Sequence, residues 1–330
     1  MMRGMLSAIC FAVALAATPA LAQDEGRGIG YVATGPIFDL PSGMSVERLE
    51  MYVSIRSVRL AYVFKSAKRQ SVHFSFALPE MPVDAGPDIV GTEAGDEAAG
   101  FTADIEPVNY LSLSVQVNGR KLALGGHGRA LYEGKDVTRR LLDAGVPLLY
   151  DPAGDAPWLK LPPEVQATLK ADGLLSLDAA NWTYQADFAW DQTFEPGETR
   201  VEVSYAPLAD YWSDINLDDF PEIATDGSAT QAYCIDDAVR RAFLSGEHYY
   251  ELYTVTHLAA PAGGWRGPVG HYRLIVDKLH PADLVAFCPL AARKTSPTRF
   301  EWTATDYTPG DAVGMLLFWD LGAASSGEQE

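Results

Sequence analysis

Two cysteines are the residues of this sequence with the most definite chemistry. Cys234 and Cys288 lie in its later half, and in an oxidising compartment two cysteines usually pair. Two separate buried thiols are the alternative, because spacing alone does not fix the geometry of a disulfide. Two sulfurs without a nearby histidine pair do not make a zinc set. The pair therefore predicts a structural bond.

Neighbouring carboxylates could act as acid and base, or could bind a hard cation. Asp236 and Asp237 suit an acid–base pair, yet their place before a helix fits capping. The run Asp214-x-Asn216-x-Asp218 is similar to the start of a calcium loop, where oxygen ligands alternate. Asp219 stands where that loop needs glycine, and Thr225 stands where it needs a bidentate glutamate. We expect a solvated acidic loop.

Other motifs of catalysis or cofactor binding are missing from the sequence. The six histidines are scattered, with no metalloprotease helix pair and no Gly-x-Ser-x-Gly elbow. Gly125-Gly126-His127-Gly128 is glycine-rich, but it follows a hairpin strand and opens no helix, so it is interpreted as a turn. We expect no catalytic residue, no cofactor and no metal.

Aromatic residues offer two ways to bind a partner. Trp265 and Arg266 stand in a loop rich in glycine and proline, and they are the residue types most often found as binding anchors. They are the candidate partner contact, and a tryptophan folded onto the core is the alternative. A second set alternates with polar neighbours, which favours core packing over a sugar-stacking platform. Its members are Trp182, Tyr184, Phe188 and Trp190.

Period-two alternation dominates the chain and predicts antiparallel sheet with one face in a core. Asn118-Gly119 adds a strong hairpin signal. Helix start and stop residues predict a helical insertion at about 134–175 and a short helix after Asp236 or Asp237. Strands are predicted at residues 49–55, 58–64, 72–78, 182–190, 249–258, 269–276, 283–288 and 299–305, and at 312–319, which is apolar on both faces.

These elements predict a mainly β fold. About 300 mature residues exceed one ordinary core, so we expect two β-sandwich-like antiparallel units. The first carries the helical insertion, and the second carries one short helix and the disulfide. The predicted units are residues 23–210 and 211–320, followed by a flexible tail at 321–330.

The first 22 residues have the pattern of a secretory signal peptide. Arg3 precedes an apolar run from Leu6 to Ala17, and Ala20-Leu21-Ala22 forms a small-residue cleavage site. The run is shorter than the roughly 20 residues that span a bilayer. Cys10 lies inside it, where a lipoprotein signal would not place its cysteine. The mature chain is expected to begin at Gln23 and to be periplasmic or secreted.

Charge and composition limit the classes of partner that the chain is expected to bind. The chain has 44 acidic and 25 basic residues, a net charge of −19. Such a charge repels nucleic acid and anionic lipid surfaces. Because 48% of its residues are hydrophobic, the chain is expected to build a core. No stretch after residue 22 reaches spanning length, so no transmembrane segment is expected in the mature chain.

Several segments spread along the chain together form a specific signature. They are Ala33-Thr34-Gly35-Pro36, Leu161-Pro162-Pro163-Glu164-Val165, Tyr233-Cys234-Ile235-Asp236-Asp237, Gly264-Trp265-Arg266-Gly267-Pro268, Tyr272-Arg273-Leu274-Ile275-Val276-Asp277-Lys278, Phe287-Cys288 and Pro297-Thr298-Arg299-Phe300-Glu301. These segments resemble the exported bacterial family known as domain of unknown function 4424, over nearly the whole mature chain. The resemblance implies export, a mostly β architecture and a disulfide from the paired cysteines, and it supplies no catalytic residues.

We therefore expect an exported, non-catalytic β-sandwich protein that binds a partner protein or an envelope component through its loops. One alternative is a glycan hydrolase, which needs two carboxylates about 5 to 9.5 Å apart in a concave pocket. A purely structural envelope protein is the other. A binding protein would instead present an exposed apolar or aromatic patch to its partner.

Overall fold

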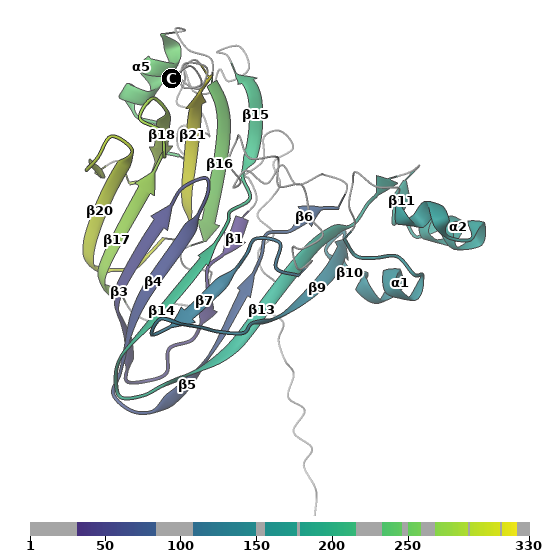
Figure 1. The fold of residues 1–330 in the computed structure, drawn as a ribbon, viewed down its shortest axis with the longest axis horizontal. Helices are drawn as coiled ribbons and strands as arrows, with labels where there is room; N and C mark the ends of the chain where they lie inside the picture. Colours follow the sequence, from purple (N-terminus) through teal and green to yellow (C-terminus); the bar gives the residue numbers. More distant parts are fainter. Residues whose placement is uncertain are drawn as a thin grey trace, which may run out of the picture.

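The computed structural model describes residues 32–83, 108–149, 156–176, 179–215, 233–245, 250–258, 268–289, 291–310 and 312–321. Over these residues the protein is mainly β, as the alternation predicts (Figure 1). The largest sheet has eight strands. In spatial order they are β19 (Arg293–Lys294), β20 (Arg299–Tyr307), β17 (Val269–Asp277), β3 (Met44–Val53), β4 (Val58–Ser66), β14 (Gly197–Tyr205), β7 (Ser114–Val117) and β8 (Arg120–Lys121).

Two further sheets and a small hairpin complete the β structure of the described residues. The six-stranded sheet comprises β10 (Lys135–Asp136), β9 (Gly125–Tyr132), β13 (Thr183–Phe194), β5 (Gln70–Ala77) and β2 (Ile37–Phe38), with β6 (Met81–Pro82) beside β13. The five-stranded sheet comprises β1 (Val32–Thr34), β16 (Tyr250–Leu258), β21 (Val313–Asp320) and β18 (Leu284–Phe287), with β15 (Asp210–Ile215) beside β16. The hairpin joins β11 (Leu175–Ser176) to β12 (Ala179–Ala180).

The main core lies between the eight-stranded and six-stranded sheets, where the apolar side of each alternating strand is buried. Phe64 of β4 packs against Phe74 of β5 and Phe194 of β13, with ring centroids 5.9 and 5.2 Å apart. The aromatic set of β13 and its preceding residue is buried in the same core. This confirms core packing for Trp182, Tyr184, Phe188 and Trp190.

The helical insertion is confirmed and is attached to the six-stranded sheet. It contains α1 (Thr138–Asp143), the 3-10 helix η1 (Pro157–Lys160) and α2 (Pro163–Ala171), and α1 and α2 lie together at one end of the molecule (Figure 1). Trp158 is buried edge-on against Trp182, with ring centroids 5.7 Å apart. Trp182 Nε1 also donates to the Leu148 carbonyl at 3.0 Å. A tryptophan pair thus fixes the insertion to the sheet.

The predicted strands at residues 49–55 and 58–64 are joined by a tight turn at Arg56-Ser57, between β3 and β4. Val53 pairs with Val58, and Ser54 Oγ accepts from the Arg56 and Ser57 amides. Within the β3–β4 pair, a register shift lies between Val46 and Arg48. It changes which face the later residues of β3 present.

The glycine run at residues 125–128 is the start of strand β9, so the predicted turn at these residues is wrong. Gly126 pairs with Phe188, and Gly128 pairs with Ala186. A Cβ at Gly128 would overlap the Tyr184 ring, and one at Gly126 would meet Phe188. The glycines therefore make room for aromatic rings.

The sheets cross the boundary predicted near residue 210. β17 lies parallel to β3, from the pair His271 and Arg48 to the pair Val276 and Val53. β1 likewise lies parallel to β16. The residues on either side of position 210 therefore share two hydrogen-bonded sheets, which alternation within single strands could not indicate.

Candidate functional site

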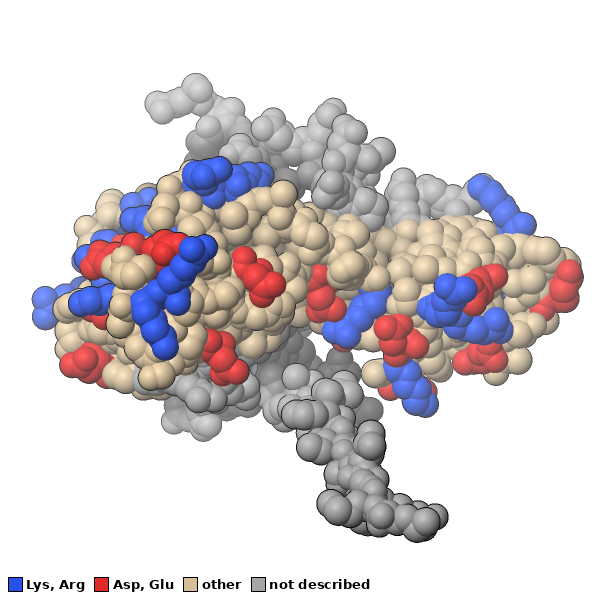
Figure 2. All heavy atoms as spheres, turned by 90° about the horizontal axis from the view of Figure 1, so that it is seen from below, with Lys and Arg blue, Asp and Glu red and all other residues tan. Residues whose placement is uncertain are grey.

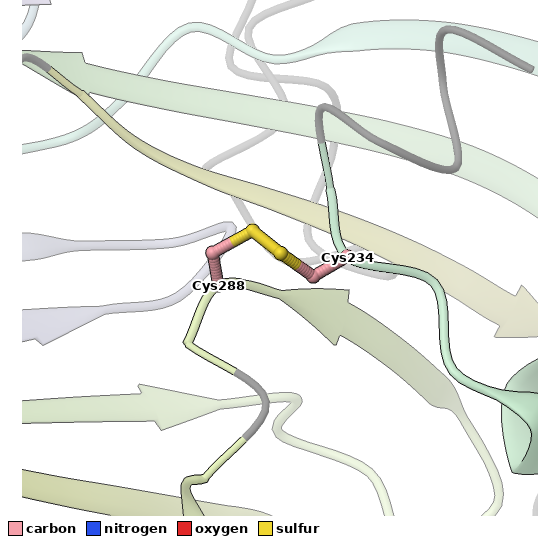
Figure 3. Close-up of a disulfide and its surroundings, with 2 residues drawn as sticks. All are labelled: Cys234 and Cys288. Atoms are coloured by element: carbon pink, nitrogen blue, oxygen red, sulfur yellow. A yellow bond between two sulfur atoms is a disulfide. The ribbon is translucent and has the colours of Figure 1, made fainter.

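The disulfide joins a helix to a sheet edge. Cys234 and Cys288 are bonded, with Cα atoms 5.3 Å apart (Figure 3). Cys288 follows β18, and Cys234 precedes α5 (Asp237–Leu244). Asp236 caps α5 by accepting from the Ala238 and Val239 amides at 2.9 and 2.8 Å. The predicted cysteine pair is thus confirmed, and the Asp236 carboxylate is the N-terminal cap of α5.

A polar face covers the outer side of β3, β17 and β20 and is the candidate site. Strand register places its side chains in rows across the three strands. The first row is Arg48, His271 and Thr305, and the second row is Glu50, Arg273 and Thr303. We call these six residues the polar face. They point away from the core because Leu49 and Tyr272, which alternate with them, are buried.

A shallow depression of about 500 Å³ lies on the polar face. All six residues of the face line it. Leu49, Tyr272 and Ala304 complete the described lining at positions between the two rows. It is open, and it is built on paired strands, so the backbone beneath its walls is held by sheet hydrogen bonds.

Arg273 lies at the centre of the polar face between two glutamates. Its Nη1 donates to Glu50 Oε2 at 2.7 Å, and its Nη2 donates to Glu301 Oε2 at 2.8 Å. Hydrogen bonds to Glu301 and Glu50 raise the pKa of Arg273. The hydrogen bond from Arg273 in turn lowers the pKa of Glu301. Glu301 is therefore held ionised, and both carboxylates are already engaged by Arg273.

Asp277 forms a second charged centre, farther along β17. Its carboxylate accepts from Arg299 Nε at 2.7 Å, the Leu279 amide at 3.0 Å and the Tyr52 hydroxyl at 3.2 Å. Burial acts to raise the pKa of Asp277, but hydrogen bonding, led by Arg299, outweighs burial and lowers it. Asp277 thus ties together β3, β17 and β20.

The Arg273–Glu301 and Asp277–Arg299 pairs join two segments that carry the family resemblance, 272–278 and 297–301. The sequence carries no signal for this pairing, because charged residues on alternating strands look like any solvated face.

Gly270 lets β17 approach the irregular part of β3. A Cβ at Gly270 would lie 2.8 Å from the Glu47 carbonyl oxygen, so a side chain there would force the backbone apart. This close approach directly precedes the pairing of His271 with Arg48. The register shift in β3 and the missing side chain at Gly270 together set the first row of the polar face.

A buried histidine lies where the three sheets meet. The Tyr205 hydroxyl of β14 and His257 Nδ1 of β16 are 2.6 Å apart, and the Tyr205 ring packs against Phe76 of β5. His257 is fully buried, and burial lowers its pKa to about 3. The folded protein therefore holds His257 neutral at any pH above that value. Burial has the opposite effect on Asp283, which directly precedes β18 and accepts from the Asp320 amide at the end of β21. It raises the pKa of Asp283 to about 6.

We expect His257 to make stability depend on pH. The unfolded chain protonates this histidine near its ordinary pKa of 6.5 but the folded chain only near 3. Between those values the unfolded state binds more protons, so stability falls as pH falls. From pH 6.5 to pH 5, wild type should lose about 2 kcal/mol of unfolding free energy relative to His257→Gln. Urea unfolding at both pH values measures this.

Comparison with His257→Gln is needed because Asp283 acts in the opposite direction. With a folded pKa of about 6 against an ordinary 3.8, it makes the folded state bind more protons between those values. Asp283 is present in both proteins, so its effect cancels in their difference. A difference that stays constant with pH would contradict a neutral buried His257.

The remaining predicted site residues fall on other parts of the chain. Trp265 and Arg266 lie outside the described residues, as do Asn216, Asp218 and most of the predicted tail. Among the residues that the structure describes, no group of three or more His, Cys, Asp or Glu side chains could hold a metal ion. No helix in the described ranges has the length and apolar character to cross a membrane.

Comparison with known proteins identifies the family. A solved structure from Legionella pneumophila, described as a "putative nutrient binding protein", is 11% identical with a TM-score of 0.41, over 87% of this chain and 70% of that one. No curated protein matches. The model of the family described as "Domain of unknown function (DUF4424)" matches residues 24–316. The chain therefore belongs to the DUF4424 family.

Proposed function

We propose that this chain is an exported, non-catalytic binding protein that recognises a partner protein or envelope component through its polar face. The observation that carries the proposal is the depression of about 500 Å³ built on three paired strands. Binding needs side chains held in fixed positions, and strands hold them better than loops do. Trp265 and Arg266 lie outside the described residues, and they remain a proposed loop contact for the partner.

Export is part of the proposal. The disulfide between Cys234 and Cys288 supports an oxidising compartment, where such bonds form and persist. The predicted signal peptide and its cleavage before Gln23 agree with this location.

The described carboxylates favour binding over glycan hydrolysis. A glycosidase needs an accessible carboxyl group with a raised pKa, because that group must donate a proton. On the polar face, the pKa of Glu301 is lowered and Glu50 is bonded to Arg273. Burial raises the pKa of Asp283 and of Asp187, but Asp283 is 3% exposed, and Asp187 lies on β13 in an ion pair with Arg129. Neither residue lines the depression.

Photo-crosslinking in the native host tests the proposal. A benzophenone amino acid would replace Thr303, which lines the depression, or Thr193, an exposed threonine on the outer side of β13. We expect a discrete crosslinked product from position 303 and none from position 193, identified by mass spectrometry. The same products from both positions, or none from position 303, would count against the polar face as the binding surface.

A further inference from the structure

The first row of the polar face offers hydrogen-bond donors and no carboxylate. Arg48, His271 and Thr305 are in register on β3, β17 and β20. Neighbouring strands lie about 4.8 Å apart, so the three side chains stand side by side. Neither His271 nor Thr305 makes a side-chain hydrogen bond to another described residue. Both residues line the depression, so their donors are available to a ligand there.

Arg48 is held more loosely than the arginine beside it. Its Nη2 lies 3.4 Å from Glu198 Oε2, and the two side chains are 58% and 59% exposed. Exposed pairs of this kind contribute about 0 to 1 kcal/mol, so a ligand can displace Glu198. Arg273 in the second row is fixed by Glu50 and Glu301, at 2.7 and 2.8 Å. The two arginines thus differ: Arg48 can bind a new anion, and Arg273 is already neutralised.

We propose that Arg48, His271 and Thr305 form a subsite for the oxyanion, a carboxylate or phosphate, of a small ligand in the depression. This rests on the proposed binding function and names the ligand's chemistry. A guanidinium group binds a carboxylate or phosphate through two parallel hydrogen bonds, which gives both strength and orientation. The imidazole and hydroxyl groups supply further donors from the adjacent strands.

The charge of the protein makes this subsite distinguishable from general anion attraction. The chain carries −19, and acidic and basic side chains are interspersed over the visible surface (Figure 2). The long-range field therefore repels anions. Any anion that binds must be held by local donors, so removing the right donor should abolish most of the binding.

Isothermal titration calorimetry of the whole exported chain tests the subsite, with inorganic phosphate and succinate as separate probes. We expect at least one to bind, and Arg48→Gln to weaken it about tenfold, the effect of losing a charge-assisted bidentate contact. His271→Gln should weaken it several-fold. Arg200→Gln is the matched control, because Arg200 lies on β14 of the same sheet, is 57% exposed and pairs with Glu202. It should change affinity less than twofold.

Two results would overturn the inference: no binding of either anion to wild type, or equal losses in Arg48→Gln and Arg200→Gln. Crosslinking at Thr303 separates these failures from failure of the proposed function. If the position 303 product persists while no anion binds, the binding function stands and the oxyanion subsite is wrong. If an anion binds through Arg48 while position 303 gives no product, the subsite stands and the macromolecular partner is wrong.

Discussion

The Cys234→Ser, Cys288→Ser protein should have an unfolding free energy about 2 to 5 kcal/mol below that of wild type. The bond closes a loop with a sequence separation of 54 residues. In the chain-entropy model, such a loop removes about 4 kcal/mol of unfolded-state freedom. Urea unfolding of the two proteins measures the loss.

The first region to open in that variant should be α5 with β18. β18 pairs only with β21 among the described strands, and α5 packs beside it in a small core that contains Val239, Phe243 and Phe318. β17 and β20 should stay protected, because they belong to the eight-stranded sheet with β3. Amide hydrogen exchange would locate the change. Wild type with the disulfide reduced is the control and should match the variant. Alkylation of both cysteines in untreated wild type would show that the bond is absent.

Phe74→Ala should lower the unfolding free energy by about 3 to 5 kcal/mol, the usual cost of removing a buried phenylalanine. Phe74 is fully buried at the centre of an aromatic cluster. Its ring centroid lies 5.0 Å from that of Phe38 and 5.1 Å from that of Trp190, with the Trp190 ring nearly parallel to it. Truncation removes contacts with both sheets and leaves a cavity that the rings cannot fill.

His73→Ala is the matched control for Phe74→Ala. His73 is the preceding residue of β5, and its 66% exposed side chain makes only a surface pair with Asp191. The His73→Ala substitution should lower the unfolding free energy by less than about 1 kcal/mol. Similar losses at the two positions would mean that β5 is oriented the other way. Because Trp190 is stacked on Phe74, the same result tests core packing against a sugar-binding platform for this aromatic row.

Local signals predicted the strands and helices well. The strand predicted at residues 249–258 corresponds to β16, and that at 269–276 corresponds to β17, within one residue at each end. In β4, where every second side chain is buried, the alternation follows directly from burial. The cap at Asp236 was also predictable, because a carboxylate before a helix satisfies its first free amides.

Contacts between distant strands had no such signal. Arg273 and Glu50 are separated by 223 positions, and nothing in either segment indicates the other. The polar face therefore could not be assembled from the sequence. The glycines of β9 were wrongly predicted to form a turn, for a related reason. Their role is set by aromatic rings on β13, and a glycine-rich run read alone favours a turn.

The parallel pairing of β17 with β3 has a consequence for biosynthesis. β3 and β4 leave the ribosome early, yet one edge of β3 has no partner until residues 269–277 are available. β1 likewise waits for β16. Contacts between residues so far apart in the sequence form slowly during folding. An open strand edge is a template for pairing with another chain. A nascent or truncated chain that ends before Val269 therefore carries an exposed aggregation edge, which the complete protein covers with its own later strand.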